Sequence, residues 1–460
     1  MTPLPPDATP QTVAIIGGGP AGLATARALK IAGIPYTLFE RHSDFGGIWD
    51  LDNPGTPMYR SAHFISSKTT SGHEGFAMPA SYPDYPSNRQ ILDFVRSFAR
   101  AFNLYEGALF NTSVSHIEDT GSGWQVTYGH QGETRTEPFG WVVCATGTNW
   151  FPNRPALKGE DSFTGTIMHA NGYRDPEMLK GKRVVVVGAG NSGVDIACDA
   201  AFMADAAYTS MRRGYHFLPK HIFGQPADVF AQSSNWIPLW LEQRIFGAML
   251  RVLNGDLTRL GLQKPDHRVF ESHPILNTQI LHYLQHGDLI AKPDIAELSG
   301  DEVVFTDNTR ARVDLIILAT GYDWHLPYLP PDLFPWKDNR AQAYLKLFNP
   351  KHPTLFLNGF IETNSSAYRL FDEMAMLIAQ VIKTQAGDAK QARIIEAVLN
   401  GPEPDLGGSV HYVNSPRHTG YTNVDAFKAA MTDFRKRFGW PAPADYYAAL
   451  PPRPEAENAA

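Results

Sequence analysis

The stretch that decides the fold is VAIIGGGPAGLATARALKIAG, residues 13–33. Its first four residues are apolar, spaced glycines follow at Gly17, Gly19 and Gly22, and the remainder has the apolar pattern of a helix. The next apolar run ends at Glu40, 23 residues after the first of these glycines. A strand, a glycine-rich turn, a helix and a second strand ending in an acid are the parts of a βαβ unit that binds a dinucleotide.

Each part of this pattern has a physical reason. The first glycine permits a tight turn, the second lets the backbone approach a pyrophosphate, and the third lets the helix pack closely on the strand. The helix, expected at Leu23–Ile31 after Pro20 and Ala21, offers unpaired N–H groups and a positive dipole end to the phosphates. The Glu40 carboxylate can accept hydrogen bonds from ribose hydroxyls, and it would repel a 2′-phosphate.

The segment after the acid indicates which dinucleotide binds here. Arg41 follows directly, and FGGIW follows at residues 45–49. A pair of glycines before a tryptophan lets the backbone approach a cofactor while the aromatic ring covers it, which favours FAD over NAD. The predicted FAD-binding residues are Gly17, Gly19, Pro20, Ala21, Gly22, Glu40, Arg41, Gly47, Ile48, Trp49, Val114 and Gly147.

A second unit of the same kind contains GAGNSG at residues 188–193. The position equivalent to Glu40 is here Met211, and Arg212 and Arg213 follow it. Guanidinium groups offer paired donors that suit a 2′-phosphate, so we expect NADPH rather than NADH; the alternative is two solvated surface arginines. The predicted cofactor contacts of this half of the chain are Gly188, Gly190, Asn191, Ser192, Gly193, Arg212, Arg213 and Gly321.

Composition excludes several classes of protein. The 460 residues include 40 Lys and Arg against 47 Asp and Glu, without a basic block, which argues against nucleic-acid binding. The two cysteines, Cys144 and Cys198, lie in apolar stretches, so a disulfide framework, a CxxC redox pair and a cysteine-rich metal site are excluded. We find no signal-peptide pattern and no apolar run near about 18 residues, and we expect a cytoplasmic protein with no transmembrane segment and no metal.

Two strands end alike, in ATG at residues 145–147 and 319–321. This likeness suggests that the second nucleotide-binding unit is inserted into the first. We therefore predict an α/β fold of two Rossmann-like dinucleotide-binding domains, with the NADPH domain inserted into a discontinuous FAD domain. The expected boundaries are 1–12 for a disordered arm, 13–162 for the first part of the FAD domain, 163–314 for the NADPH domain, 315–450 for the second part of the FAD domain and 451–460 for a tail.

A segment at about 225–273 stands apart from both nucleotide-binding patterns. Its apolar residues, among them Trp240 and Phe246, have helical spacing, and Arg244 and Arg251 lie opposite them. We interpret it as a packed helical insertion. A role at a membrane surface or in substrate access is the alternative.

Between the two units stands FTGTIMHANGY, residues 163–173. It fits the pattern FxGxxxHxxxY through Phe163, Gly165, His169 and Tyr173. With this motif the chain resembles the flavin-containing monooxygenases, the class of single-component flavoproteins that also includes the Baeyer–Villiger enzymes. The likeness spans nearly the whole chain: both glycine fingerprints, the GGxW segment, this bridge motif and the later ATGY strand end.

The resemblance implies a reaction sequence. FAD at the first site is reduced by NADPH from the second, reduced flavin and O₂ form a C4a-hydroperoxide shielded by NADP⁺, and a nucleophilic small-molecule substrate takes up one oxygen. Such an oxidant needs a dry pocket. In this family the bridge motif lies between the domains, so we assign His169 a linking role rather than general-base work. Related enzymes are often dimers, so a homodimer is expected by analogy.

The chain departs from the family at one point. Many members carry an Asn before a Lys after the GGxW segment, where it supports the oxygenated flavin and the nicotinamide. The matching stretch is HFISSK at residues 63–68, so Ser66 or Ser67 would supply a weaker donor and the protein could lose peroxide more readily. Ser66, Ser67 and Asn191 are the candidate catalytic residues, although we expect Asn191 to contact NADP⁺ or its own loop rather than react.

Three enzymatic functions compete. The first is N- or S-oxygenation of soft nucleophiles such as amines, sulfides or indole-like compounds. The second is Baeyer–Villiger oxidation of ketones, against which Tyr173 followed by Arg174 counts, because the bridge motif of those enzymes ends in Trp followed by Pro or Asp. The third is a flavoprotein reductase or uncoupled NADPH oxidase, and a dithiol reductase is disfavoured by the absence of paired cysteines. A non-catalytic nucleotide-binding protein is the remaining alternative.

Overall fold

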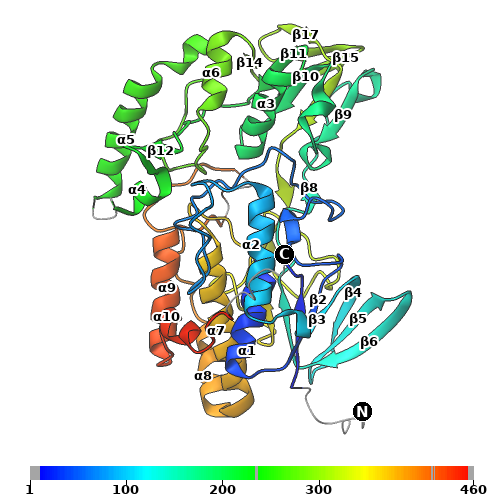
Figure 1. Cartoon of the computed structure of the whole chain (residues 1–460), viewed down its shortest axis with the longest axis vertical. Helices are drawn as coiled ribbons and strands as arrows, with labels where there is room; N and C mark the ends of the chain where they lie inside the picture. Colours follow the sequence, from blue (N-terminus) through cyan, green and yellow to red (C-terminus); the bar gives the residue numbers. More distant parts are fainter. Residues whose placement is uncertain (1–10, 234–236, 416–417, 419, 454–460) are drawn as a thin grey trace.

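The computed structural model describes residues 11–233, 237–415, 418 and 420–453. Most of the expected arm (1–12) and tail (451–460) therefore lies outside the described residues. Figure 1 shows two bodies, one with α1, α2 and α7 and one with α3, α6 and β10. Within the described part of the chain no helix combines the length and the apolar character that crossing a membrane requires.

The first body is built on a parallel five-stranded sheet in the order β22-β7-β1-β2-β3. Its strands are fully apolar at the centre, because helices cover both faces of such a sheet. A three-stranded antiparallel meander, β4-β5-β6, extends from it. The strands are β1 (Val13–Ile16), β2 (Tyr36–Phe39), β3 (Ala108–Leu109), β4 (Thr112–Asp119), β5 (Trp124–His130), β6 (Glu133–Phe139), β7 (Trp141–Cys144) and β22 (Leu355–Leu357).

The helices of this body begin and end where the sequence supplies caps. α1 starts at Pro20 after the N-cap Gly19 and stops at Gly33, whose φ of 70° is the left-handed conformation of a helix end. α2 starts with a capping box between Ser87 and Gln90. The helices are α1 (Pro20–Ala32), α2 (Asn88–Ala101), α7 (Tyr368–Gly387), α8 (Ala389–Leu399), α9 (Val424–Arg437) and α10 (Pro443–Ala448).

The second body has its own parallel five-stranded sheet, in the order β14-β11-β10-β18-β9. A small antiparallel sheet, β15-β16-β17, packs beside it through Leu298, Val303 and Phe305. Its elements are β9 (Thr166–His169), β10 (Arg183–Val187), α3 (Asn191–Met203), β11 (Ala206–Ser210), α6 (Gln279–His286), β14 (Ile290–Lys292), β15 (Ile295–Ser299), β16 (Glu302–Phe305), β17 (Arg310–Arg312) and β18 (Leu315–Leu318).

The predicted α/β fold with two Rossmann-like units is confirmed, but one boundary is wrong. Residues 315–318 were expected to rejoin the first domain, whereas β18 pairs with β10 and β9 in the second sheet. The chain returns to the first body after Gly321, and Trp324 and Leu326 then pack beside β1 and β7. The boundary was misplaced because each of the two parallel sheets has one strand that ends in an ATG turn. A strand that ends in this way can therefore belong to either body.

Short two-stranded ribbons complete the architecture. β8 (Phe151–Pro152) pairs with β19 (Tyr322–Asp323), and these two segments are the outgoing and returning connections between the bodies. β20 (Trp336–Lys337) pairs with β21 (Arg340–Ala341). Both cysteines are buried, so they contribute to the two cores as small apolar residues.

The segment after Arg213 forms a separate lobe beside the second body. It contains β12 (His221–Ile222), β13 (Gln225–Pro226), α4 (Ala227–Ser233) and α5 (Leu239–Asn254). Phe246 and Leu250 of α5 pack in a small core of this lobe. Its other side stays exposed, with Trp240 at 56% and Val252 at 85% of their full accessible surface.

Candidate functional site

The first glycine turn is held together by backbone contacts that leave no room for side chains. Gly17 has a φ of +110°, and a Cβ there would lie 2.7 Å from the carbonyl oxygen of Ala145. A Cβ on Gly22 would lie 1.9 Å from the carbonyl oxygen of Gly17. The N-terminus of α1 is capped by Gly19, which has no side chain to bond its N–H groups. The first turn of α1 therefore offers free donors to an anion.

The GGxW segment lies directly on this turn. Gly47 has a φ of +57°, and a Cβ there would lie 2.9 Å from the Cα of Gly19. A Cβ on Gly19 would in turn lie 3.6 Å from the Cα of Gly47. The two loops thus form a cradle of bare backbone that a single methyl group would fill. This is the geometry that a pyrophosphate of a dinucleotide requires.

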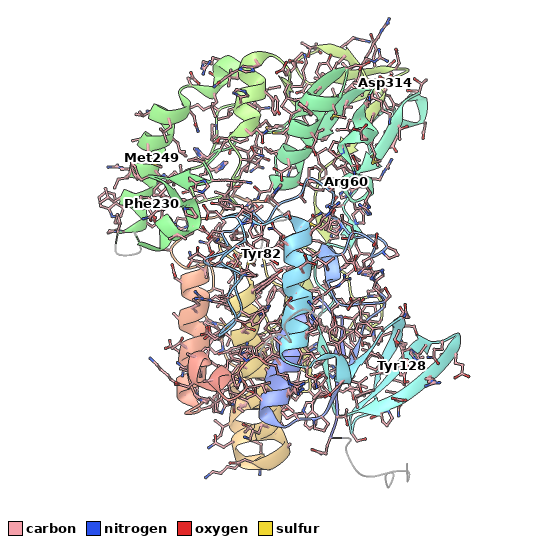
Figure 2. The ribbon with its side chains drawn as sticks, viewed as in Figure 1. Arg60, Tyr82, Tyr128, Phe230, Met249 and Asp314 are labelled. Atoms are coloured by element: carbon pink, nitrogen blue, oxygen red, sulfur yellow. The ribbon has the colours of Figure 1, made fainter. Side chains whose placement is uncertain are left out.

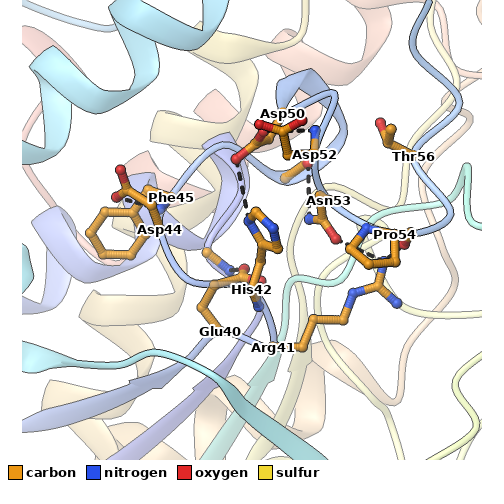
Figure 3. Close-up of polar contacts among 12 residues, drawn as sticks. Glu40, Arg41, His42, Asp44, Phe45, Asp50, Asp52, Asn53, Pro54 and Thr56 are labelled. Atoms are coloured by element: carbon orange, nitrogen blue, oxygen red, sulfur yellow. Dashed lines mark hydrogen bonds and ion pairs between the residues drawn. The ribbon is translucent and has the colours of Figure 1, made fainter. Parts of the chain in front are cut away.

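Glu40 directly follows β2, beside the same turn, and is buried (Figure 3). Its Oε2 accepts a hydrogen bond of 2.7 Å from the N–H of Gly18, and its Oε1 accepts one of 2.8 Å from the N–H of His42. Burial raises the pKa of this carboxyl, and the two backbone donors oppose that rise. The carboxylate is fixed in place, and each oxygen retains a lone pair for a ribose hydroxyl.

The other residues predicted for the first site lie on the GGxW turn, directly after β2, in the meander and after β7. Trp49 is buried and its ring centroid lies 5.2 Å from that of Phe64. Arg41 turns away: its guanidinium donates to the carbonyl of Pro54 at 3.0 Å (Figure 3). The same guanidinium covers the ring of Trp150. Val114 lies within strand β4 of the meander. Ile48 belongs to the same turn as Trp49, and Gly147 has a φ of +75° after β7.

The second glycine turn repeats the construction of the first. Gly188 has a φ of +114°, and a Cβ there would lie 2.5 Å from the carbonyl oxygen of Ala319. A Cβ on Gly193 would lie 2.4 Å from the carbonyl oxygen of Gly188. Gly190 is the N-cap of α3, with Asn191 and Ser192 in the first turn. The end of β18 therefore supports this turn just as the end of β7 supports the first.

Arg212 and Arg213 follow β11, which runs parallel to β10 in register. The carboxyl ends of parallel neighbours meet at one edge of the sheet, so the two arginines and the glycine turn share that edge. Met211 is fixed before them: its N–H donates to the carbonyl of Lys292 at 3.0 Å, and its carbonyl accepts from Gln263 at 3.0 Å. Arg212 is exposed and Arg213 half-buried, so both guanidiniums can meet an anion arriving from solvent.

Asn191 has a structural partner that the sequence did not indicate. Its Nδ2 donates to the carbonyl of Pro274 at 3.2 Å, and its Oδ1 accepts from the N–H of Leu276 at 3.2 Å. Both ends of the amide thus hold the loop that leads from the lobe back to α6. These contacts differ from the contact with its own loop that was one expectation for Asn191. The other expectation, a contact with NADP⁺, stays a prediction.

Ser66 and Ser67 differ in their surroundings. Ser67 is fully buried, and its N–H and Oγ both donate to Oδ2 of Asp228, at 2.8 and 3.0 Å. Ser66 is half-buried. The hydroxyl of Ser67 is therefore already committed to a carboxylate of the lobe, and Ser66 is the serine of the pair that could turn toward a ligand.

His169 of the bridge motif contacts Gly321, which belongs to the second body and directly precedes the connection that returns to the first body. The ring of His169 bonds the carbonyl of Gly321 through Nε2 at 3.0 Å, and its Nδ1 accepts from the N–H of Asn171 at 3.2 Å. Burial lowers the pKa of this imidazole. The neutral ring with hydrogen on Nε2 satisfies both contacts, and the linking role of His169 stays a prediction. A Cβ on Gly165 would lie 2.7 Å from the carbonyl of Asp314, so only glycine lets β9 approach β18 here.

Two carboxylates at the junction of the bodies escaped the sequence analysis. Asp195 and Asp199 lie one turn apart on α3 and burial raises the pKa of both. Asp195 accepts from the hydroxyl of Tyr59 at 3.2 Å, and Asp199 accepts from that of Tyr173 at 2.9 Å. The signal that could have revealed them is an i, i+4 pair of acids on an otherwise apolar helix.

Two glycine turns, each at a helix N-terminus without a side-chain cap and each on its own parallel sheet, define a protein that binds two dinucleotides. The comparisons with known proteins name the class. A sequence model of the family described as flavin-binding monooxygenase-like matches residues 10–418, and the chain belongs to this family. The predicted class, a flavin-dependent monooxygenase, is thereby confirmed.

Relatives and solved structures agree with this placement. The chain is 29% identical to flavin-containing monooxygenase 5 of Cavia porcellus over 89% of this chain and 80% of that protein. The structure of S-allyl-L-cysteine S-oxygenase from Allium sativum has a TM-score of 0.65 at 21% identity, covering 96% of this chain and 92% of that one. A structure of OTEMO in complex with FAD and NADP has a TM-score of 0.67 at 17% identity, covering 94% and 99%.

Proposed function

We propose that the chain is an NADPH- and O₂-dependent flavin monooxygenase that oxygenates soft nucleophiles: amines, sulfides or indole-like compounds. It would hold FAD at the first glycine turn and NADPH at the second. The observation that carries this proposal is the pair of turns with the same backbone geometry and different following residues. A buried carboxylate, Glu40, stands beside the first turn, and two arginines share the sheet edge of the second.

At the first turn, the N–H groups at the start of α1 would bind the pyrophosphate, and Glu40 would accept from ribose hydroxyls. When bound, FAD supplies the redox chemistry that passes electrons from NADPH to O₂ and one oxygen atom to the substrate. Trp49, Phe64 and Tyr368 form a chain of ring contacts, with centroids 5.2 and 5.6 Å apart, on one side of the cradle. These rings would keep water from that side.

At the second turn, Arg212 and Arg213 would bind the 2′-phosphate of NADPH. A carboxylate at this place would select NADH, since it bonds the 2′-hydroxyl and repels a phosphate. His169 needs no role in proton transfer, because both ring nitrogens are occupied in holding Asn171 and Gly321 together. The chain's contribution is to bind, orient and shield, which is the usual division of work between a protein and its cofactor.

The preference for soft nucleophiles is supported by the bridge motif, which ends in Tyr173 and Arg174 rather than in the Trp followed by Pro or Asp of Baeyer–Villiger enzymes. The cytoplasmic location and the homodimer stay predictions.

The test measures NADPH consumption, O₂ consumption, oxygenated product and hydrogen peroxide with a panel of thioethers, tertiary amines, indoles and cyclic ketones. We expect product to match NADPH for a thioether or an amine. Lactone or ester from ketones alone would replace this proposal by Baeyer–Villiger oxidation. Peroxide equal to NADPH with every compound would replace it by an NADPH oxidase.

A further inference from the structure

A segment of the first body, residues 58–70, lies against the second body and the lobe. We call it the strap. Figure 2 shows Arg60 of the strap at the level where the two bodies meet. At one end of the strap, the hydroxyls of Tyr59 and Ser61 donate to Asp195 and Asp199 of α3. At the other end, its donors converge on a single carboxylate of the lobe.

That carboxylate is Asp228, in the first turn of α4. Its Oδ2 accepts from the N–H of Ser67 at 2.8 Å, from the hydroxyl of Ser67 at 3.0 Å and from the hydroxyl of Thr70. Its Oδ1 accepts from the N–H of Val229 at 3.0 Å. Three strap donors on one oxygen are charge-assisted hydrogen bonds, which are stronger than those between neutral groups.

Phe64 lies in the strap three residues before Ser67 and beside the cofactor cradle. Phe64 packs its ring on Trp49 of the GGxW segment and on Tyr368 of α7. Lys68, next to Ser67, holds the strap to the first body: its N–H donates to the carbonyl of Asp84 at 2.8 Å, and its Nζ donates to the carbonyls of Ala80 and Tyr82. Phe64 is also held by its own N–H, which donates to the carbonyl of Pro86 at 2.8 Å, so Asp228 fixes the end of the strap on the lobe side, three residues beyond Phe64.

The lobe also touches the first body at a second place, which offers a matched control. His221 of β12 and Asp84 form an ion pair of 2.9 Å, with 45% and 49% of their side chains exposed. This pair joins the same lobe to the same body without contacting Ser67 or Thr70. Exposed pairs of this kind contribute little to stability.

We propose that Asp228 is a positioning residue for the oxygenation reaction: by fixing Ser67 it keeps the strap on Trp49 and water out of the flavin side of the cradle. This inference rests on the proposed function, since it assumes a flavin at the first turn. It gives the lobe a role in the coupling of NADPH oxidation to oxygen transfer. Without Asp228, the buried N–H of Ser67 loses its acceptor, while the hydroxyl keeps Thr70 within 3.5 Å, and the strap must move to satisfy the N–H.

The experiment compares Asp228→Ala, Asp228→Asn and Asp84→Asn with the unaltered protein. The main readout is hydrogen peroxide released per minute with NADPH and O₂ and no substrate, which does not depend on knowing the substrate. We expect about a tenfold rise for Asp228→Ala, the scale set by a lost hydrogen bond to a charged group. Asp228→Asn retains one acceptor oxygen, so its rate of peroxide release should lie between those of Asp228→Ala and the unaltered protein. Asp84→Asn should release peroxide at the rate of the unaltered protein.

A second readout separates positioning from damage to the fold. Anaerobic reduction of the flavin by NADPH should keep its rate in all three variants, because the second glycine turn is untouched. Peroxide release unchanged in both Asp228 variants, or raised equally in Asp84→Asn, would overturn the inference. If Asp228→Ala does not fold, Asp228→Asn decides by the same comparison. Failure of the proposed function is distinct: the unaltered protein would then yield no oxygenated product.

Discussion

The replacement Gly193→Ala tests whether the second glycine turn delivers the reducing nucleotide. The added Cβ would lie 2.4 Å from the carbonyl oxygen of Gly188. Ordinary contact begins about 1 Å further out, so α3 must move away from the turn by about that distance, and misplacement on this scale can cost about 100-fold in rate. We therefore expect the reduction of bound flavin by NADPH to slow about 100-fold.

The assay is anaerobic stopped-flow mixing with NADPH, followed by the flavin absorbance. Gly247→Ala is the matched control, because no atom lies within 4 Å of the place where its Cβ would be. Both variants should bind as much flavin as the unaltered protein and should be reduced normally by dithionite, since the first turn lies on the other sheet. A Gly193→Ala protein reduced by NADPH at the normal rate, or one that has lost its flavin, would refute the assignment of the two turns.

Three further predictions follow from single groups. Arg212→Ala should lower kcat/KM for NADPH about tenfold or more while changing that for NADH little; an unchanged ratio of the two would show that the arginines are only a solvated surface. Replacing Ser66 and Ser67 together by Ala should raise peroxide release if either hydroxyl supports the oxygenated cofactor, and no change would dismiss both. Glu373 is 9% exposed, and burial raises the pKa of its carboxyl to about 7 from the ordinary 4.5. Because the folded protein holds this proton more tightly, Glu373 lowers the free energy of unfolding as pH rises from 4.5 to about 7, by about 3 kcal/mol in all. Glu373→Gln should therefore gain stability over the unaltered protein near pH 8 and lose that advantage near pH 4.5, as measured by urea unfolding; an equal difference at both pH values would contradict the burial of the charge.

The sequence predicted the two glycine turns because their geometry depends on neighbouring residues. Gly17 and Gly188 need positive φ values, and Gly22 and Gly193 need the absence of a Cβ next to a carbonyl a few residues away. Glu40 was likewise predictable, since the end of β2 lies beside the turn in every unit of this kind. Requirements that involve residues close to one another in the sequence can therefore be recognised from a single amino-acid sequence.

Contacts between distant segments left no such signature. The apolar strand 315–318 fits either sheet, and only its pairing with β10 decides. Asn191 meets Pro274 across 83 residues, and Ser67 meets Asp228 across 161 residues. Nothing in the local pattern around either residue indicates these partners. These long-range partners were therefore missed, and the roles expected of Ser67 and Asn191 toward the cofactors stay predictions.

The most direct test of the two-site assignment is the absorption spectrum of the purified protein before and after anaerobic addition of NADPH. We expect a yellow protein with bound FAD that NADPH bleaches faster than NADH does. A colourless protein that takes up no added FAD would contradict the first site, and a bound flavin that NADPH leaves oxidised would contradict the second.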